Sequence, residues 1–490
     1  MVTWISRSCR VRPPPAKIIA TMNPKPFQIN RRRFLKTTAA ISAATGMPAW
    51  FLEQEMAHAA VPKLLGANDK PGIALVGCGG QGRGDCNTAR RFGEVIAVCD
   101  VDKSHGEAAA KQFKSGEKVP AVYTDFRKLM ERDDVHIIIT GTPDHWHTMV
   151  NLLAVRTGKD VYSEKPLTLC IDEGKRLVKA VRDHKRILQV GSQQRSDRNF
   201  RLACELVRNG RIGKLQHMIV GLPTGPNDGP FQTLPIPESL NWDFYLGQAP
   251  KMDYVGEVEL KKGADGAEIK NYKARCAHWD FRWWYCFSGG QMTDWGAHHD
   301  DIAQWGNGTE RSGPVEIDGK SLSAMKPGGF TAAATYRIDM KYGNGVTLTI
   351  VDGSTGTERN VVGSATETPN GIQFLGSDGW IFVTRGAIKA SRPELLETAL
   401  PENRAVKLYQ SSDHMGNFFE SVRSRQDPIC DVEIGHRSIS VAHLGVISIR
   451  MNQPLKWNPD LEIFTGANAA EANKWLVREQ RKPYDYSFIA

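Results

Sequence analysis

Short apolar runs alternate with mixed polar and apolar segments between residues 70 and 190. Apolar runs bounded by turn residues predict buried strands, and the mixed segments between them predict helices. This alternation is typical of an α/β domain with a doubly wound, Rossmann-type parallel sheet, whose ligands bind at the carboxyl ends of the strands. The predicted strands are 72–76, 94–100, 133–140, 160–165 and 187–190, and the predicted helices are 105–113, 148–157 and 173–184.

The pattern changes after residue 190. Residues 222–275 are rich in Pro, Gly and Lys and predict loops, whereas residues 331–383 alternate around Gly-Asn and Asp-Gly turns and predict antiparallel hairpins. With a helix predicted over 436–451, this indicates an α+β domain with an open, mainly antiparallel sheet. The chain therefore divides into an N-terminal segment (1–59), a Rossmann domain (66–190) and a C-terminal α+β domain (191–490).

The turn after the first predicted strand carries Gly77, Gly79 and Gly82 in the spacing G-x-G-x-x-G. The first glycine permits a tight turn, the second lets the backbone approach a pyrophosphate, and the third allows close packing of helix on strand. The next strand ends at Asp100, where an acid accepts hydrogen bonds from the ribose hydroxyls and favours NAD over NADP. Together these features predict a dinucleotide site; the alternative is a glycine turn without a ligand.

Charge is concentrated at the N-terminus. The 490-residue chain has a formal net charge of +9, and residues 1–59, with nine Lys or Arg and two Glu, carry +7 of it, which leaves +2. The remainder therefore lacks the basic excess that nucleic-acid binding requires. No run of 18 or more apolar residues follows residue 59, so we predict no membrane span.

The basic N-terminus resembles an export signal. Residues 30–36 are similar to the twin-arginine motif, with Arg31 and Arg32 as the pair. A mildly apolar stretch (37–52) and a small-x-small site at 57–59 follow, as in a cleaved signal peptide. We predict export to the periplasm through the twin-arginine translocase; the alternative is a basic tail.

A lysine lies at the end of the strand predicted over 160–165, within Ser163-Glu164-Lys165-Pro166. This edge of a dinucleotide-binding sheet is where the nicotinamide lies. A partly desolvated lysine there can donate to a substrate hydroxyl and stabilise the alkoxide as hydride leaves. The alternative is a surface lysine at a strand–loop junction.

A second polar cluster occupies residues 289–301 and begins with two glycines. If this segment is one helix, Asp294, His298 and Asp301 share a face, and the aspartate can orient the imidazole and raise its basicity. The alternatives are a structural histidine and a metal site. Because neighbouring helical side chains such as His298 and His299 point about 100° apart and chelate poorly, we predict no metal.

In combination, these motifs are similar to those of the Gfo/Idh/MocA oxidoreductases, which include glucose–fructose oxidoreductase and inositol dehydrogenase. The resemblance extends from about residue 71 to 451. It rests on the glycine motif and on Thr142-Pro143 with His147, Glu164-Lys165-Pro166, and Asp294 with His298. It implies hydride transfer between NAD, or NADP, and a hydroxyl of a sugar or polyol.

The resemblance also implies roles for single residues: His298 is the general base, Asp294 orients it, and Lys165 polarises the reacting oxygen. The expected cofactor contacts are Gly77, Gly79, Gly80, Gln81, Gly82, Asp100, Thr142, Pro143, His147, Glu164 and Lys165. The expected sugar contacts are Lys165, Gln194, Arg195, Trp283, His298 and His299. Since such second domains commonly bury the free sheet face against a copy of themselves, we expect a homodimer or homotetramer.

Three functions are consistent with this sequence. The first is an exported NAD-dependent dehydrogenase of a sugar or glycoside. The second is a redox-neutral enzyme with tightly held NAD, either a glycosidase acting by oxidation, elimination and re-reduction or a sugar–sugar oxidoreductase. The third is a non-catalytic sugar-binding protein, which the presence of Lys165, Asp294 and His298 disfavours.

Overall fold

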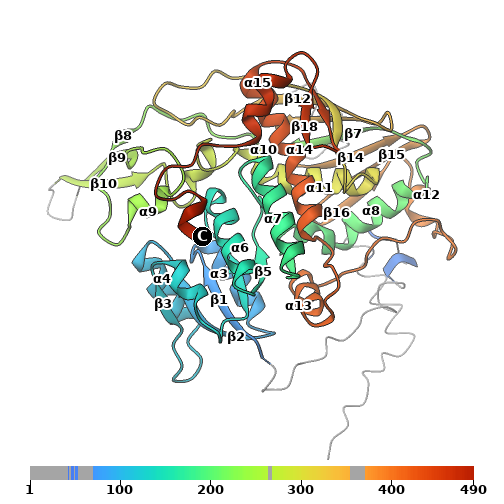
Figure 1. Ribbon diagram of the computed structural model, residues 1–490. Coiled ribbons are helices and arrows are strands. Elements are labelled where there is room, and N and C mark those ends of the chain that lie inside the picture. The colour runs from blue at the N-terminus through green and yellow to red at the C-terminus, as the bar shows by residue number, and fades with distance from the viewer. Residues whose placement is uncertain (1–41, 43–45, 49, 53–69, 263–267, 354–369) are drawn as a thin grey trace, which may run out of the picture.

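The computed structural model describes residues 42, 46–48, 50–52, 70–262, 268–353 and 370–490 (Figure 1). Nearly all of the predicted export signal lies outside these residues. Two of its described residues, Phe51 and Leu52, are buried in the hydrophobic core. The described residues contain no helix that is both long enough and apolar enough to cross a membrane.

The N-terminal domain is built on six parallel strands in the order β3-β2-β1-β4-β5-β6. The strands are β1 (Gly72–Val76), β2 (Glu94–Cys99), β3 (Ala121–Tyr123), β4 (Ile137–Thr140), β5 (Asp160–Ser163) and β6 (Leu188–Val190). The helices between them are α3 (Gly80–Ala89), α4 (Lys103–Gln112), α5 (Phe126–Met130), α6 (Asp144–Arg156) and α7 (Ile171–Asp183). Four strands (β1, β4, β5 and β6) are buried throughout, as expected for a parallel sheet covered on both faces. The predicted Rossmann fold is confirmed.

The strand order reverses beside β1. Strands β2 and β3 extend the sheet on one side of β1, and β4, β5 and β6 extend it on the other. The loops that leave β1 and β4 therefore diverge, and a crevice opens between them at the carboxyl edge of the sheet. This crevice is where the glycine motif and Thr142 lie.

The C-terminal domain is built on a nine-stranded sheet in the order β16-β15-β14-β7-β13-β12-β11-β17-β18. Only β7 and β13 are parallel, so the sheet is mainly antiparallel and open at both ends, as predicted. Its strands are β7 (Leu215–Leu222), β11 (Pro314–Ser321), β12 (Tyr336–Tyr342), β13 (Thr347–Asp352), β14 (Gly371–Gly376), β15 (Gly379–Thr384), β16 (Ala387–Ala390), β17 (Leu455–Asn458) and β18 (Ile463–Thr465).

Helices of the C-terminal domain pack on this sheet and also on the first domain. They are α8 (Arg198–Arg208), α9 (Trp242–Leu246), α10 (Gln291–Asp294), α11 (Gly296–Asn307), α12 (Glu394–Glu397), α13 (His414–Ser424), α14 (Val432–Met451) and α15 (Ala469–Ala472). Helix α14 contacts both β11 and α7, and so joins the two domains. After α13, Arg425 forms an ion pair with Asp160 of β5 at 2.7 Å. Late parts of the chain thus help to hold the nucleotide-binding sheet.

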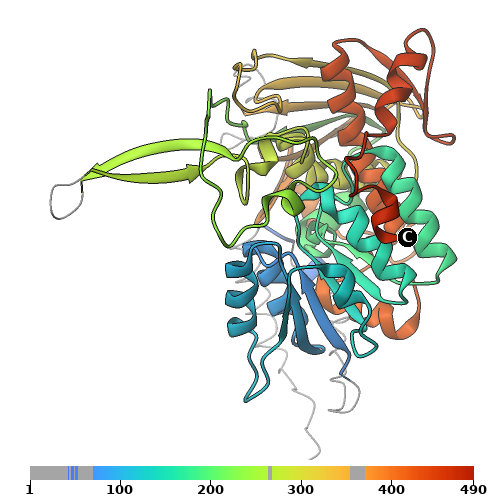
Figure 2. The same ribbon diagram turned by 60° about the vertical axis from the view of Figure 1, so that its left-hand side comes forward.

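The segment predicted as loops over 222–275 contains a small sheet instead, in the order β10-β9-β8. Its strands are β8 (Gln232–Thr233), β9 (Val255–Lys262) and β10 (Glu268–Ala274). The loop prediction was wrong because the alternation of polar and apolar residues is short and lies within a lysine- and glycine-rich stretch. Figure 2 shows that β9 and β10 project from the body of the molecule as a long hairpin.

Candidate active site

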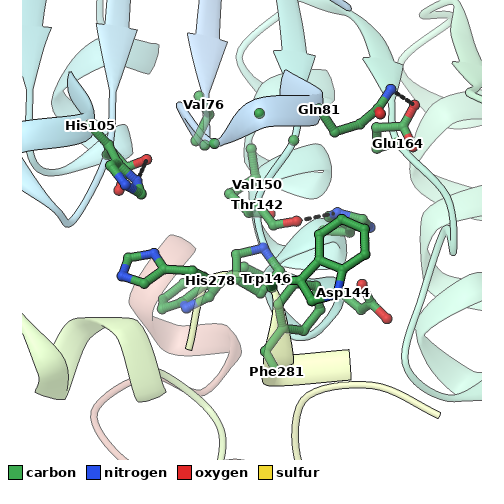
Figure 3. Close-up of a pocket in the computed structure, with 18 of the residues that line it drawn as sticks. Val76, Gln81, His105, Thr142, Asp144, Trp146, Val150, Glu164, His278 and Phe281 are labelled. Atoms are coloured by element: carbon green, nitrogen blue, oxygen red, sulfur yellow. Dashed lines mark hydrogen bonds and ion pairs between the residues drawn. The ribbon is translucent and has the colours of Figure 1, made fainter. Parts of the chain in front are cut away.

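A cavity of about 680 Å³ lies at the carboxyl edge of the parallel sheet. The Rossmann domain supplies one wall, and the C-terminal domain supplies the other through residues 278–282 and the junction of α10 and α11. Figure 3 shows Gln81 and Glu164 at one end of this cavity and His105 and His278 at the other. The cavity therefore spans the region from the second strand of the sheet to the fifth.

The glycine loop forms the floor of the cavity. Gly77 has φ of +90°, and a Cβ atom there would lie 2.4 Å from the backbone of Gly141, so only glycine fits. At Gly82 a Cβ atom would lie 2.2 Å from the carbonyl oxygen of Gly77. At Gly79 and Gly80, in contrast, a Cβ atom would meet no protein atom within 4 Å. The backbone is thus open at the two positions that face the cavity.

Helix α3 begins at this open position. Its N-cap residue is Gly79, and no side chain caps the first turn. The first N–H groups of a helix have no partner within the helix, and the helix dipole favours an anion beside them. The loop and the helix N-terminus therefore fit the pyrophosphate of a dinucleotide.

Asp100 lies at one end of the cavity, directly after β2. Its carboxylate accepts hydrogen bonds from the backbone N–H groups of Cys78 (2.7 Å) and Asp102 (2.8 Å). Burial raises the pKa of Asp100, although these two N–H groups and His105 partly offset that effect. The carboxylate is fixed in place beside the glycine loop, where it fits the adenosine ribose.

Two histidines lie beside this acid. The ring of His105, from the first turn of α4, is 4.8 Å from the ring of His278, which comes from the C-terminal domain. Together with Asp102 they form the one group of potential metal ligands found among the described residues, with ligand atoms within 4.8 Å of one another. Sequence analysis missed both histidines, because only the tertiary fold places His278 beside α4.

The loop after β4 carries Thr142, whose Oγ1 is buried and has no hydrogen-bond partner. His147 fixes this loop: its Nε2 lies 2.8 Å from the carbonyl oxygen of Thr142, and its Nδ1 lies 2.7 Å from that of Pro166. Burial lowers the pKa of His147. His147 therefore links two loops that border the cavity, and it leaves the hydroxyl of Thr142 free for a ligand.

Glu164 is buried among amides and a second carboxyl. Gln193 Nε2 donates to its Oε1 at 3.2 Å, and Gln81 lies within hydrogen-bond distance of both Glu164 and Asp85. Burial raises the pKa of Glu164, and it raises that of Asp85 well above the usual value, with the proximity of Glu164 as the second cause. The two carboxyl groups and two amides form a polar cluster next to Lys165.

Lys165, the middle residue of the Glu164–Pro166 motif, donates through Nζ to the side chain of Asp294 and, at 3.2 Å, to its carbonyl oxygen. Arg282 lies 3.6 Å from the other carboxylate oxygen of Asp294. Burial alone would raise the pKa of Asp294, but Lys165 and Arg282 outweigh it and the net change is a decrease. Asp294 is therefore ionised and holds the ammonium group of Lys165 at the cavity.

The expected hydrogen bond between Asp294 and His298 is absent. Helix α10 ends at Asp294 and α11 begins at Gly296, but Trp295 between them keeps helical angles (φ −78°, ψ −30°), so the Asp294 carboxylate misses the imidazole because it pairs with Lys165. His298 lines the cavity, yet its Nδ1 is buried without a partner. Burial, with Lys165 and Arg385 nearby, lowers the pKa of His298 well below its usual value. The imidazole is therefore neutral and able to accept a proton.

Four of the residues expected to contact a sugar do not line the cavity. Gln194 donates to the backbone carbonyl of His298 at 3.1 Å, Nε2 of His299 donates to the side-chain oxygen of Asn370 at 2.7 Å, and the indole nitrogen of Trp283 donates to Asp280 at 3.2 Å. The cavity is instead lined by Gln193, Arg282, Arg385, Trp295 and Phe281. Gln193 adjoins Gln194, and Phe281 and Arg282 lie within two residues of Trp283, whereas Trp295 and Arg385 are further from every expected contact.

Arg195, the fourth of these residues, is 1% exposed and binds Asp301 through two hydrogen bonds of 2.7 and 2.8 Å. Its remaining terminal nitrogen donates to Glu310 at 3.1 Å. Asp301, which was expected to share a face with Asp294 and His298, is committed to this ion pair. The ion pair therefore fixes α11, which carries Asp301, to the segment that carries Arg195, and both residues are structural.

We expect Arg195→Met to lower the free energy of unfolding by about 3–5 kcal/mol, because it leaves Asp301 as an unpaired buried charge. Denaturant unfolding measures this difference. Arg423→Met is the matched control: Arg423 pairs with Glu420 at the surface, and such a pair contributes about 0–1 kcal/mol. An equal loss in both variants would contradict the structural role of Arg195.

Comparisons with known proteins agree with this geometry. Residues 72–192 match the family profile described as Gfo/Idh/MocA oxidoreductase family, NAD-binding Rossmann fold. Residues 227–486 match the profile described as the C-terminal alpha/beta domain of the same family. Both domains of the chain are thus matched, in the same order.

Among curated proteins, the chain is 29% identical over 209 residues to a glycosyl hydrolase family 109 protein of Shewanella pealeana, covering 39% of this chain and 45% of that protein. It is 30% identical over 145 residues to an inositol 2-dehydrogenase/D-chiro-inositol 3-dehydrogenase of Lacticaseibacillus casei, covering 29% and 41%. The chain therefore spans less than half the length of these relatives.

Among solved structures, the chain is similar to the WlbA dehydrogenase of Bordetella pertussis, crystallised with NADH and UDP-GlcNAcA. The TM-score is 0.54 at 18% identity, and the match covers 79% of this chain and 99% of that one. At this identity the likeness shows a common fold.

Proposed function

The chain belongs to the Gfo/Idh/MocA family of NAD-binding oxidoreductases, and on this premise we propose that it transfers hydride between NAD and a hydroxyl group of a sugar, glycoside or polyol. The observation that carries the proposal is the position of Lys165 and His298. Both line the same cavity as the glycine loop and Asp100. An acid–base pair and a dinucleotide site thus line one cavity.

Each residue has a chemical task in this reaction. Lys165 donates a hydrogen bond to the reacting oxygen and stabilises the negative charge that develops there. Neutral His298 accepts the proton of the substrate hydroxyl. Asp294 positions Lys165, in place of the imidazole that it was expected to orient. The glycine loop and Asp100 would hold NAD, which would supply the hydride acceptor for the carbon that carries this hydroxyl.

A redox-neutral reaction with retained NAD is the second candidate. The similarity to a protein named as a glycosyl hydrolase supports it. So does the way in which the C-terminal domain borders the cavity: His278 lies beside His105 at the adenosine end, and Trp279 and Phe281 line the cavity as well. A cofactor enclosed by both domains would dissociate slowly, as recycling within one active site requires.

Absorbance at 340 nm separates these functions. The purified protein, without added cofactor, is mixed with a panel of sugars and glycosides. A rise that stops near one equivalent per subunit supports hydride transfer to NAD that is already bound. Continued turnover on addition of NAD supports the dehydrogenase, and release of a free sugar without net NADH supports the redox-neutral reaction.

The same measurement can overturn the proposal. If no sugar changes the absorbance and no free sugar is released, even with NAD supplied, hydride transfer to NAD from these compounds is contradicted. Calorimetric binding of the same sugars would then favour the non-catalytic sugar-binding protein.

We expect the acid limb of the pH dependence of kcat/KM to have its midpoint below pH 6.5. His298 must be neutral to accept a proton, and its lowered pKa keeps it neutral until the pH falls through that value. Arg385→Gln should move the midpoint upward, because it removes one of the charges that lower this pKa. Lys389→Gln, which removes a charge outside the cavity wall, should leave the midpoint unchanged.

Export is a separate part of the proposal and rests on the sequence around Arg31 and Arg32. We expect the double variant Arg31→Lys/Arg32→Lys to stay in the cytoplasm of a bacterial host with a twin-arginine translocase. Cell fractionation measures the distribution. Equal amounts of both proteins in the periplasm would contradict this route.

A further inference from the structure

Two imidazoles and a carboxylate converge where the Rossmann domain meets the C-terminal domain. Asp102 is the N-cap residue of α4 and His105 lies in its first turn, whereas His278 comes from the C-terminal domain. One ligand atom of each residue lies within 4.8 Å of the other two, and Nε2 of His278 is 4.0 Å from Oδ2 of Asp102. All three residues line the cavity, and Figure 3 shows both histidines at the same end of it.

Contacts of the backbone hold these residues near one another. The N–H of Asn241, at the start of α9, donates to the carbonyl oxygen of Val101 at 3.0 Å, which ties the loop before α4 to the C-terminal domain. On the same helix α9, the hydroxyl of Tyr245 accepts a hydrogen bond from the N–H of His278 at 3.1 Å. The convergence therefore does not depend on the three side chains themselves.

The backbone of His278 has an uncommon conformation. Its φ of +55° lies in the left-handed region, which few residues other than glycine adopt. Such a conformation persists only where the surrounding structure imposes it, and it is concentrated at active sites and ligand clamps. This observation is independent of the distances between the three side chains, and it also points to a ligand at this position.

The charges and the atom types favour a transition-metal ion. Oδ2 of a second aspartate, Asp100, lies 3.9 Å from Nδ1 of His105, so two carboxylates place negative charge beside the imidazoles. Imidazole nitrogen together with carboxylate oxygen is a donor set that suits Zn²⁺ and its first-row neighbours, whereas Mg²⁺ and Ca²⁺ prefer oxygen ligands alone. The cluster therefore selects for the first group of ions.

From these observations we propose that Asp102, His105 and His278 bind a divalent transition-metal ion such as Zn²⁺. Ligand atoms of a tetrahedral zinc site lie about 3.3–3.5 Å apart, because each bond is about 2.0–2.1 Å long. The ligand atoms must therefore approach one another by roughly 1 Å. Rotation of the two imidazoles, which are 37% and 38% exposed, supplies this movement.

The bound ion joins the two domains at the adenosine end of the cavity. One of its ligands comes from the C-terminal domain, and two come from the start of α4 in the Rossmann domain. Three protein ligands leave a fourth position for water. The site is separate from His298 and His299, and the inference does not depend on the proposed hydride transfer.

Zinc titration of the full chain, freed of metal by a chelator and without NAD or sugar, tests the site. The wild type should bind one equivalent that Mg²⁺ at the same concentration does not displace. His278→Gln should raise the Kd for Zn²⁺ by about 100-fold or more, because even the loss of a group that orients a ligand costs about 10–100-fold. His184→Gln is the matched control, since His184 is exposed and lies outside the cluster.

Asp102→Asn separates the ligand from the helix cap. Asparagine caps a helix as well as aspartate does, so the thermal midpoint without metal should not change. The amide is a poorer zinc ligand than the carboxylate, so the Kd for Zn²⁺ should rise. With Co²⁺ as the probe, the visible absorption spectrum of the bound ion should differ from that of the wild type.

Three results would overturn the proposal. The first is a wild-type chain that binds no stoichiometric Zn²⁺, and the second is an equal loss of affinity in His184→Gln and His278→Gln. The third is a His278→Gln variant that binds Zn²⁺ normally but has a higher Kd for NAD, because the imidazoles would then contact the cofactor rather than a metal. Since the titration needs neither cofactor nor sugar, a failure of the proposed reaction does not affect it.

Discussion

Lys165→Ala is expected to lower kcat by about 10²–10⁴-fold, the usual contribution of a positioned acid–base group. The ammonium group lines the cavity and is held by Asp294. Steady-state kinetics with an active sugar measures the loss. NAD affinity should change little, because the glycine loop and Asp100 are untouched.

A second substitution defines what the lysine does. Lys165→Arg keeps a positive charge beside Asp294 but replaces a compact ammonium by a larger planar group that does not deprotonate. If charge alone is needed, this variant should recover part of the activity that Lys165→Ala loses. Turnover by Lys165→Ala within about tenfold of wild type would show that another group polarises the substrate.

The cofactor end of the site could be predicted from the sequence because it is local. Gly77, Gly79 and Gly82 act through the conformation of one turn, and Asp100 follows the very next strand. Parallel strands place their carboxyl ends at one edge, so the end of β5 and therefore Lys165 could be placed as well. None of these inferences required a contact between distant elements.

The substrate end could not be predicted in the same way. Asp294 and His298 were placed on a common helical face, but the Asp294 carboxylate pairs with Lys165, 129 residues away in the sequence, rather than with the imidazole. Arg195 was assigned to the sugar, yet Asp301 attracts it into the interior. In both cases an ion pair between elements far apart in the chain decides the side-chain direction, and spacing carries no information about it.

Gly79→Val is expected to raise the Kd for NAD by about 10²-fold or more while leaving the fold intact. Gly79 has φ of −67° and ψ of −177°, which valine adopts without strain, and a Cβ atom there meets no protein atom within 4 Å. The new side chain fills the space in which the pyrophosphate meets the helix N-terminus. The loss of one hydrogen bond to the charged pyrophosphate weakens binding by about 1.5–3 kcal/mol. Each 1.4 kcal/mol corresponds to about a tenfold change in Kd.

The choice of Gly79 makes this result interpretable. Substitution of Gly77 or Gly82 would press a Cβ atom against backbone, so loss of binding could follow from loss of structure. Gly84→Val is the matched control, because Gly84 lies on the same helix, is equally open and does not line the cavity. Calorimetric titration should show a higher Kd for NAD in Gly79→Val than in Gly84→Val. In the absence of NAD, the two variants should have the same thermal midpoint. Equal affinity in both would place the phosphate away from the start of α3.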